Sequence, residues 1–120
     1  MNSLIQEIFK DFIVNGVSIP VSFLKYEGHG EPYITYMETD KDNVLGGDDE
    51  ILGYVSYYDF DIYSKGNYLN IVEEVKELMK QNGFMWQPSR DSADMYENDT
   101  GYYHKTICFA IEKEVYQWQI

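Results

Sequence analysis

Apolar and polar residues alternate most regularly between Gly53 and Tyr63. On one parity the side chains are mainly apolar or aromatic: Tyr54, Tyr58, Phe60 and Ile62. Successive side chains of a strand point to opposite faces of a sheet, so this alternation predicts a half-buried strand over residues 52–63. Runs rich in β-branched and aromatic residues predict further strands at 19–25, 33–38, 84–87 and 102–115.

Near the N-terminus the apolar residues recur instead at helical spacing: Leu4, Ile5, Ile8, Phe9, Phe12 and Ile13. This spacing predicts a helix over residues 3–14, with Ser3 and Gln6 as a capping box and Gly16 as the stop signal. The apolar stripe covers about half of the helix circumference, which is wider than one core contact normally needs. Part of it is therefore left for a second contact.

A second helix is predicted over residues 67–82, because its apolar residues fall on one face. Asn67 is the expected N-cap and Gly83 the expected C-cap. Glutamates stand nearer the start of this segment and lysines nearer its end, as the helix dipole prefers. Both ends of this helix are thus marked in the sequence.

The predicted order is helix, three strands, helix, two strands, which indicates the α+β class. We expect a single domain over residues 1–120, with an antiparallel or mixed sheet of about four to five strands and both helices packed on one face. The acidic segment 40–50, with Gly46 and Gly47 at its bend, is predicted to be the long loop of a hairpin.

The charge and hydrophobicity of the chain exclude several classes of function. The 120 residues carry 9 basic and 21 acidic side chains, for a net charge of −12. Non-specific nucleic-acid binding depends on Lys and Arg that neutralise phosphates, so we expect no sequence-specific or general nucleic-acid partner. No apolar run approaches the ~20 residues of a membrane span. The start of the chain lacks the basic region of a secretory signal, and we expect folding in the cytosol.

The sequence contains few candidates for catalytic or metal-binding residues. Asp59 and Asp61 share one face of their strand, where a metal ion could bridge them as in a nuclease, but a solvated sheet face is the favoured interpretation. His104 and Cys108 also share a face, yet about 13 Å of strand separates them, which excludes a catalytic dyad. Cys108, the lone cysteine, is expected to be a small buried core residue. Segment 40–50 lacks the ligand spacing of a calcium loop. We predict no cofactor, no metal and no catalytic residue.

Aromatic residues are more abundant than a small core needs. The chain has 12 tyrosines, and its two tryptophans are Trp86 and Trp118. Tyr and Trp are enriched at protein interfaces, so we expect some of them to contact partners. The residues predicted to form protein contacts are Leu45, Asp48, Asp49, Glu50, Trp86, Tyr96 and Trp118.

Several segments of the second half resemble one protein family. They are Asp59-Phe-Asp-Ile-Tyr-Ser-Lys-Gly66, the helix Ile71-Val-Glu-Glu-Val-Lys-Glu-Leu78, Asn82-Gly-Phe84, and Tyr96-Glu-Asn-Asp-Thr-Gly-Tyr-Tyr-His-Lys105 with the apolar strand that follows it. Together they resemble the tail terminator proteins of long-tailed bacteriophages and prophages, also called tail-to-head joining or tail completion proteins. The resemblance covers residues 50–113, while the first half agrees only in layout.

This resemblance implies a non-enzymatic virion protein of the head–tail junction, made in the cytoplasm of a bacterial host. Such proteins close into a ring, usually a hexamer, on the tail tube protein, stop its polymerisation and face the head completion or connector protein. The acidic segment 40–50 is then expected to contact the tube or to line the lumen. Three alternatives stay open: another head–tail connector protein, a small metal-dependent phage nuclease using Asp59 and Asp61, or an acidic inhibitor that mimics DNA.

Overall fold

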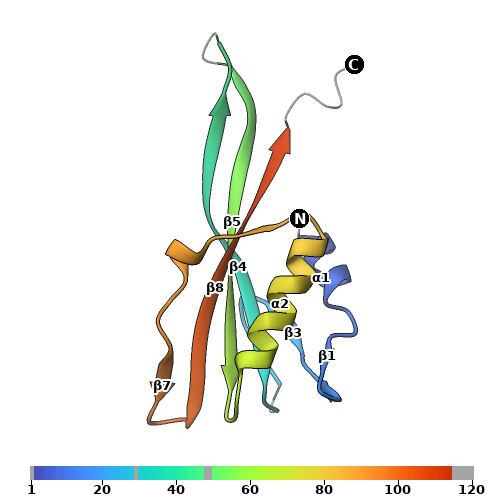
Figure 1. The fold of residues 1–120 in the computed structure, drawn as a ribbon, viewed down its shortest axis with the longest axis vertical. Helices are drawn as coiled ribbons and strands as arrows, with labels where there is room; N and C mark the ends of the chain where they lie inside the picture. The colour runs from blue at the N-terminus through green and yellow to red at the C-terminus, as the bar shows by residue number, and fades with distance from the viewer. Residues whose placement is uncertain (1, 29, 48–49, 115–120) are drawn as a thin grey trace.

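The structure, a computed structural model, describes residues 2–28, 30–47 and 50–114 and has an α+β fold (Figure 1). Its elements in chain order are α1 (Asn2–Ile8), β1 (Ile13–Val14), β2 (Val17–Ser18), β3 (Val21–Phe23), β4 (Tyr33–Leu45), β5 (Ile51–Ser64), α2 (Leu69–Gln81), β6 (Met85–Trp86), the 3₁₀ turn η1 (Pro88–Arg90), β7 (Met95–Glu97) and β8 (Tyr102–Glu114). The predicted fold class is confirmed.

The main sheet is mixed and has six strands in the described residues. Its order is β3-β4-β5-β8-β6, and β7 also pairs with β8. β3 runs parallel to β4, and the other pairs are antiparallel. The prediction of four to five strands is too low, because β7 and the separate hairpin of β1 and β2 are too short to show a period-2 pattern.

Both helices pack on the same face of the sheet, as predicted. The even-numbered side chains of β5 and the odd-numbered side chains of β8 point toward them, since Phe60 pairs with Ile107 and Tyr58 with Phe109. Residues from α1, α2 and these strands form one hydrophobic core, whose least exposed members include Ile5, Ile34, Phe60, Ile62, Val75, Met79, Ile107 and Phe109.

The N-terminal helix is shorter than predicted. α1 ends at Ile8, and residues 13–18 form the β1–β2 hairpin. Asn15 and Gly16 have φ values of 52° and 79°, the left-handed conformation that a two-residue hairpin loop requires. Gly16 is therefore a hairpin residue and not a helix stop. Phe9 and Phe12 are buried outside the helix, which explains the wide apolar stripe.

The predicted capping box is also absent. Ser3 lies inside α1, and the Gln6 side chain donates a hydrogen bond to the Tyr36 hydroxyl at 2.9 Å. Gln6 therefore ties the first helix to β4 and does not close its own first turn.

The C-terminal end of α2 agrees with the sequence prediction, but its N-cap is Tyr68 and not Asn67. Gly83 has φ of 86° and donates its N–H to Lys80, while Phe84 donates to Met79. These two bonds form the Schellman motif that glycine favours after a helix. At the other end, Asn67 Oδ1 accepts the Leu69 N–H at 3.0 Å, one residue before the geometric N-cap.

β4 and β5 continue beyond the helices as a projecting hairpin (Figure 1). Residues 40–45 are strand, paired from Asp40↔Tyr57 to Leu45↔Ile51, so their prediction as a loop is wrong. Acidic residues are depleted in strands on average, but here the side chains reach solvent while the backbone pairs with β5. We call residues 38–45, 51–56 and 111–114 the arm.

Candidate functional site

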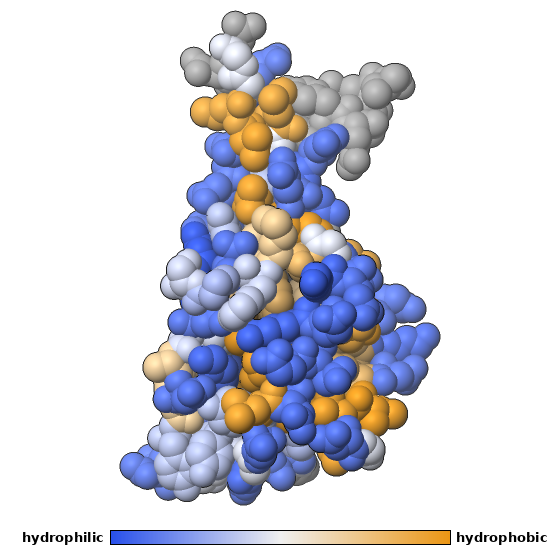
Figure 2. Space-filling model, viewed as in Figure 1, coloured by the Kyte–Doolittle hydropathy of each residue, from blue (hydrophilic) through white to orange (hydrophobic). Residues whose placement is uncertain are grey.

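The end of the arm carries exposed apolar side chains. Leu45, Ile51 and Leu52 are 58%, 44% and 42% exposed. They flank a bend in which Gly46 donates its N–H to the Glu50 carbonyl at 2.7 Å. Figure 2 shows the resulting apolar band across the arm, directly below its end. We call these three residues the arm tip.

The arm is held as a three-stranded structure by close backbone contact. A Cβ placed on Gly53 of β5 would lie only 2.2 Å from the Lys113 carbonyl oxygen of β8. On one face, Lys41 lies 3.4 Å from Glu38 and its ammonium is 4.7 Å from the centre of the Tyr54 ring. The arm tip is thus carried on an ordered support.

The arm is strongly acidic. Its described charged side chains, with Glu50 at the bend, are Glu38, Asp40, Asp42, Glu50, Glu112 and Glu114 against Lys41 and Lys113. β3 pairs with β4 only as far as Tyr36, so the outer edge of β4 in the arm has no partner strand among the described residues. Charges and the bulge between Glu38 and Asp40 protect such an edge from unspecific pairing.

Residues 85–97, which we call the strap, run along the outer edge of β8. Asp91 Oδ1 accepts the Cys108 N–H at 2.9 Å, and Ser92 exchanges two hydrogen bonds with the Thr106 backbone, at 2.9 and 2.8 Å. Arg90 stacks over the Tyr57 ring at 3.7 Å. The strap therefore seals β8 between β7 and β6.

Asp59 and Asp61 lie on the sheet face next to the strap and are half-buried, so the predicted solvated face is wrong. Asp61 Oδ1 lies 3.0 Å from His104 Nε2 and accepts a hydrogen bond from the Thr106 hydroxyl at 2.5 Å. His104 Nδ1 is 3.7 Å from Glu97 of β7. The Asp61 carboxylate is thus engaged by its own neighbours.

Burial perturbs the ionisation of this face. It raises the pKa of Asp59, against the lowering effects of the adjacent Cys108 thiol and Arg90. Burial also raises the pKa of Cys108 to about 12, and the neighbouring Asp59 carboxylate adds to the rise. Cys108 is fully buried as predicted, although it lies on the strap side of the sheet. An un-ionised thiol is a poor nucleophile and a poor metal ligand.

Several of the tyrosines that lie outside the core pack against one another. Tyr33 stacks on Tyr26 and on Tyr63, with ring centres 4.5 and 4.8 Å apart, and Tyr63 stacks on His104 at 4.2 Å. The rings thus form a ladder across β4, β5 and β8 on the face away from the helices. They cover one another, which removes the need for a partner at these positions.

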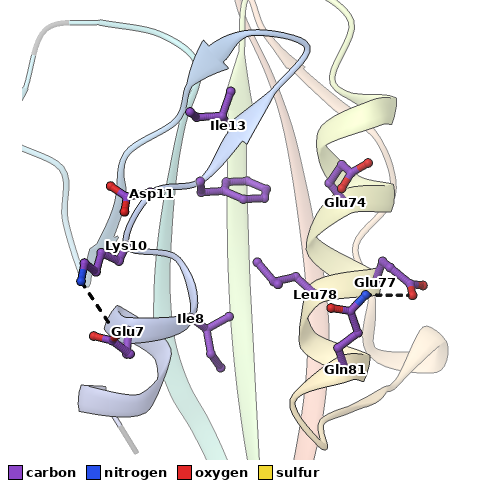
Figure 3. A pocket seen from close by; sticks show the side chains of 10 residues that line it. Glu7, Ile8, Lys10, Asp11, Ile13, Glu74, Glu77, Leu78 and Gln81 are labelled. Atoms are coloured by element: carbon purple, nitrogen blue, oxygen red, sulfur yellow. Dashed lines mark hydrogen bonds and ion pairs between the residues drawn. The ribbon is translucent and has the colours of Figure 1, made fainter.

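A groove of about 500 Å³ lies between α1 and α2 (Figure 3). Phe12 forms its buried base, Ile8 and Leu78 are half-buried, and Ile13 is 60% exposed. Figure 3 shows Leu78 directed from α2 toward the first helix. The remaining lining residues are Glu7, Lys10, Asp11, Glu74, Glu77 and Gln81.

The predicted contact residues fall in different places. Leu45 and Glu50 lie together at the end of the arm, whereas Trp86 and Tyr96 lie on the strap. Trp86 donates its indole N–H to Asp91 at 2.8 Å, and the Lys76 ammonium lies 3.8 Å from its ring centre. The Tyr96 ring is tilted by 55° against the Tyr103 ring, with the ring centres 4.9 Å apart. Asp48, Asp49 and Trp118 lie outside the described residues.

Sequence reasoning missed Ile51, Leu52 and the groove residues Ile13 and Leu78. Two leucines and an isoleucine on either side of a glycine-rich bend were the available signal for the arm tip. For the groove, the wide apolar stripe of residues 3–14 was a partial signal, since it contains Ile8, Phe12 and Ile13, but their position opposite Leu78 depends on how α1 and β1 meet α2.

No protein-family model matches this chain, and a search of curated proteins finds no match. Neither helix in the described residues is long and apolar enough to cross a membrane. Within the same residues, no group of three or more His, Cys, Asp or Glu side chains is arranged to hold a metal ion. The arm tip and the groove are the two candidate surfaces that we consider further.

Proposed function

We propose that this chain is a phage tail terminator that docks on the tail tube through its arm and joins the tail to the head as one subunit of a ring. One observation carries the proposal: a projecting hairpin ends in three exposed apolar side chains, Leu45, Ile51 and Leu52. Exposed aliphatic groups gathered at the end of a protrusion are typical of protein contact and unsuited to a water-filled lumen. The arm tip therefore favours tube contact over the lumen.

The small binding free energy expected of one arm tip supports a ring of several subunits. Complete burial of one aliphatic side chain is worth about 1.5–3 kcal/mol, and these three are already partly covered, so a single arm tip supplies only a few kcal/mol. A micromolar complex needs about 8 kcal/mol. Several arms on a symmetric tube end add their contributions, because each later contact forms within the same assembly.

The net negative charge of the chain supports a monomer in the absence of the tail tube. Each copy has a net charge of −12, and the arm and groove rim are both acidic. Like charges brought together in an interface oppose association. The tube end then acts as the template that brings copies together, and the same subunit presents its other end to the connector.

The contacts of Asp59 and Asp61 favour this proposal over a nuclease. His104 and Thr106 both contact Oδ1 of Asp61, so a bridging metal ion would have to compete with them for that oxygen. Burial raises the pKa of Asp59, which disfavours its ionised form. A nuclease would show metal-dependent cleavage that Asp61→Asn abolishes, and we expect no cleavage.

The test is co-sedimentation of the purified chain with tubes assembled from the tail tube protein of the same phage. We expect binding to tube ends, observed by electron microscopy, and its loss in Leu45→Asp/Leu52→Asp. Leu69→Asp is the matched control, because Leu69 is 59% exposed but lies on α2. Equal binding by both variants would remove the arm tip from the interface. Binding to the head connector alone would move the protein to a head completion role.

A further inference from the structure

The groove between α1 and α2 is a second candidate surface, distant in the chain from the arm tip, with an apolar floor inside a mainly polar lining. Its floor is formed by Ile8, Phe12 and Leu78, and Ile13 borders it with 60% of its surface exposed. Its volume of about 500 Å³ accommodates several side chains. Ile13 belongs to the small β1–β2 hairpin and not to the main sheet, so its exposed side chain is not part of the packing of that sheet.

The rim of the groove has one dominant sign of charge. Among the described residues that line it, Glu7, Asp11, Glu74 and Glu77 are acidic and Lys10 is basic. Lys10 lies 4.0 Å from Glu7, and Gln81 donates to Glu77 at 3.3 Å, as Figure 3 shows. The net charge of the rim is negative on both sides, with Glu7 and Asp11 against Lys10 on one side and Glu74 and Glu77 on the other.

From this combination we propose that the groove binds a basic amphipathic segment of another protein, with apolar side chains on the floor and Lys or Arg side chains at the rim. Amphipathic helices are recognised in this way, by an apolar groove that takes one face of the helix. Complementary charges at the rim select the partner and accelerate its association. This interaction is independent of the arm tip and of the proposed function.

Neither the arm tip nor the groove of a second copy meets these requirements. Its arm tip is apolar but surrounded by carboxylates, and its groove has the same acidic rim. Docking either surface into the groove would place like charges opposite one another. The occupant must instead supply cations, which this chain has in low number, with 9 basic against 21 acidic residues.

The test uses fluorescence anisotropy of a labelled amphipathic helical peptide with a leucine stripe flanked by lysines. A matched peptide has glutamate in place of every lysine. We expect saturable binding of the lysine peptide that weakens with salt, and no binding of the glutamate peptide. Amide chemical shifts should change at Ile13 and Leu78.

Charge reversal on the protein separates a specific groove from the general attraction of an acidic protein. Glu74→Lys/Glu77→Lys should weaken binding of the lysine peptide by roughly tenfold or more and create binding of the glutamate peptide. Asp42→Lys/Glu112→Lys makes the same change of charge on the arm and should leave binding nearly unchanged. Ile13→Ser should weaken binding without altering the circular dichroism spectrum, because Ile13 is exposed.

Three results would overturn the inference. Equal loss in the two charge-reversal variants would mean general electrostatic attraction. Absence of saturable binding would mean that the groove has no such ligand. A concentration-dependent dimer of the chain that the lysine peptide dissociates would identify a second copy as the occupant.

Discussion

Asp91 accepts a hydrogen bond from the backbone N–H of Cys108 at 2.9 Å, so a side chain takes the place of a neighbouring strand on the outer edge of β8. The second oxygen of the same carboxylate accepts the Trp86 indole N–H at 2.8 Å. One residue thus fastens the strap to the sheet and to β6. A strand edge closed in this way cannot pair with another chain.

Replacing Asp91 should therefore weaken the fold. Asp91→Ala leaves the Cys108 N–H without its acceptor, and a buried unsatisfied donor costs about 1–3 kcal/mol. We expect a loss of this size in the free energy of unfolding, measured by urea denaturation. Asp99→Ala is the control, since Asp99 is exposed. Equal stability of the two variants would show that the Asp91 hydrogen bond is dispensable.

Cys108 should report the opening of the strap. Its side chain is fully buried, and burial raises the pKa of its thiol to about 12, so the reactive thiolate is suppressed near neutral pH. We expect iodoacetamide to modify Cys108 slowly in the native protein and rapidly in urea, as followed by mass spectrometry. Asp91→Ala should accelerate the native reaction. Modification at the unfolded rate without urea would contradict the buried position.

Gly53 should be required for the arm. An alanine Cβ would lie 2.2 Å from the Lys113 carbonyl oxygen, so β5 and β8 must separate locally. Overpacking of this kind costs about 1–3 kcal/mol. We expect that loss in the free energy of unfolding, with faster hydrogen exchange in the arm. Gly66→Ala is the control, because its Cβ would meet nothing within 4 Å. Unchanged exchange in Gly53→Ala would disprove the close contact.

Asp59 should destabilise the protein when it is ionised. Burial raises its pKa in the folded state, so the folded chain binds the proton more tightly than the unfolded chain does. Its contribution to stability therefore grows as the pH falls through the folded pKa and is lost at higher pH. Asp59→Asn, which stays neutral, should be more stable than the parent near pH 7.

The difference between Asp59→Asn and the parent should shrink toward about pH 4, where the unfolded carboxyl also begins to protonate. Urea midpoints at several pH values measure this directly. Asp99→Asn, at an exposed position, should show no such trend. A variant less stable than the parent at neutral pH would mean that the interactions with Cys108 and Arg90 outweigh burial.

Sequence patterns predicted the helix and strand whose ends or faces are set by neighbouring residues. Gly83 marked the end of α2, and the alternation in residues 52–63 identified β5 and its buried parity. The N-terminal hairpin was missed because Phe9, Phe12 and Ile13 follow helical spacing by chance, although Asn15-Gly16 is a hairpin signal. Burial of Phe9 and Phe12 from a non-helical segment depends on tertiary packing.

The candidate sites were harder to predict. Leu45 and Glu50 were expected at a contact surface, but Asp40 and Asp42 made residues 40–45 look like a loop and hid the strand that carries Leu45. The strap depends on Asp91 and Ser92 acting as substitutes for backbone pairing. No local pattern distinguishes such residues from those of an ordinary acidic loop, because their partners on β8 lie more than a dozen residues away in the sequence.

We propose that this chain ends tail growth by capping the tube. Electron microscopy of tails from a phage or prophage that lacks its coding region tests it most directly. We expect tubes of uncontrolled length without heads, corrected by the parent chain but not by Leu45→Asp/Leu52→Asp. Tails of normal length joined to heads in its absence would contradict it.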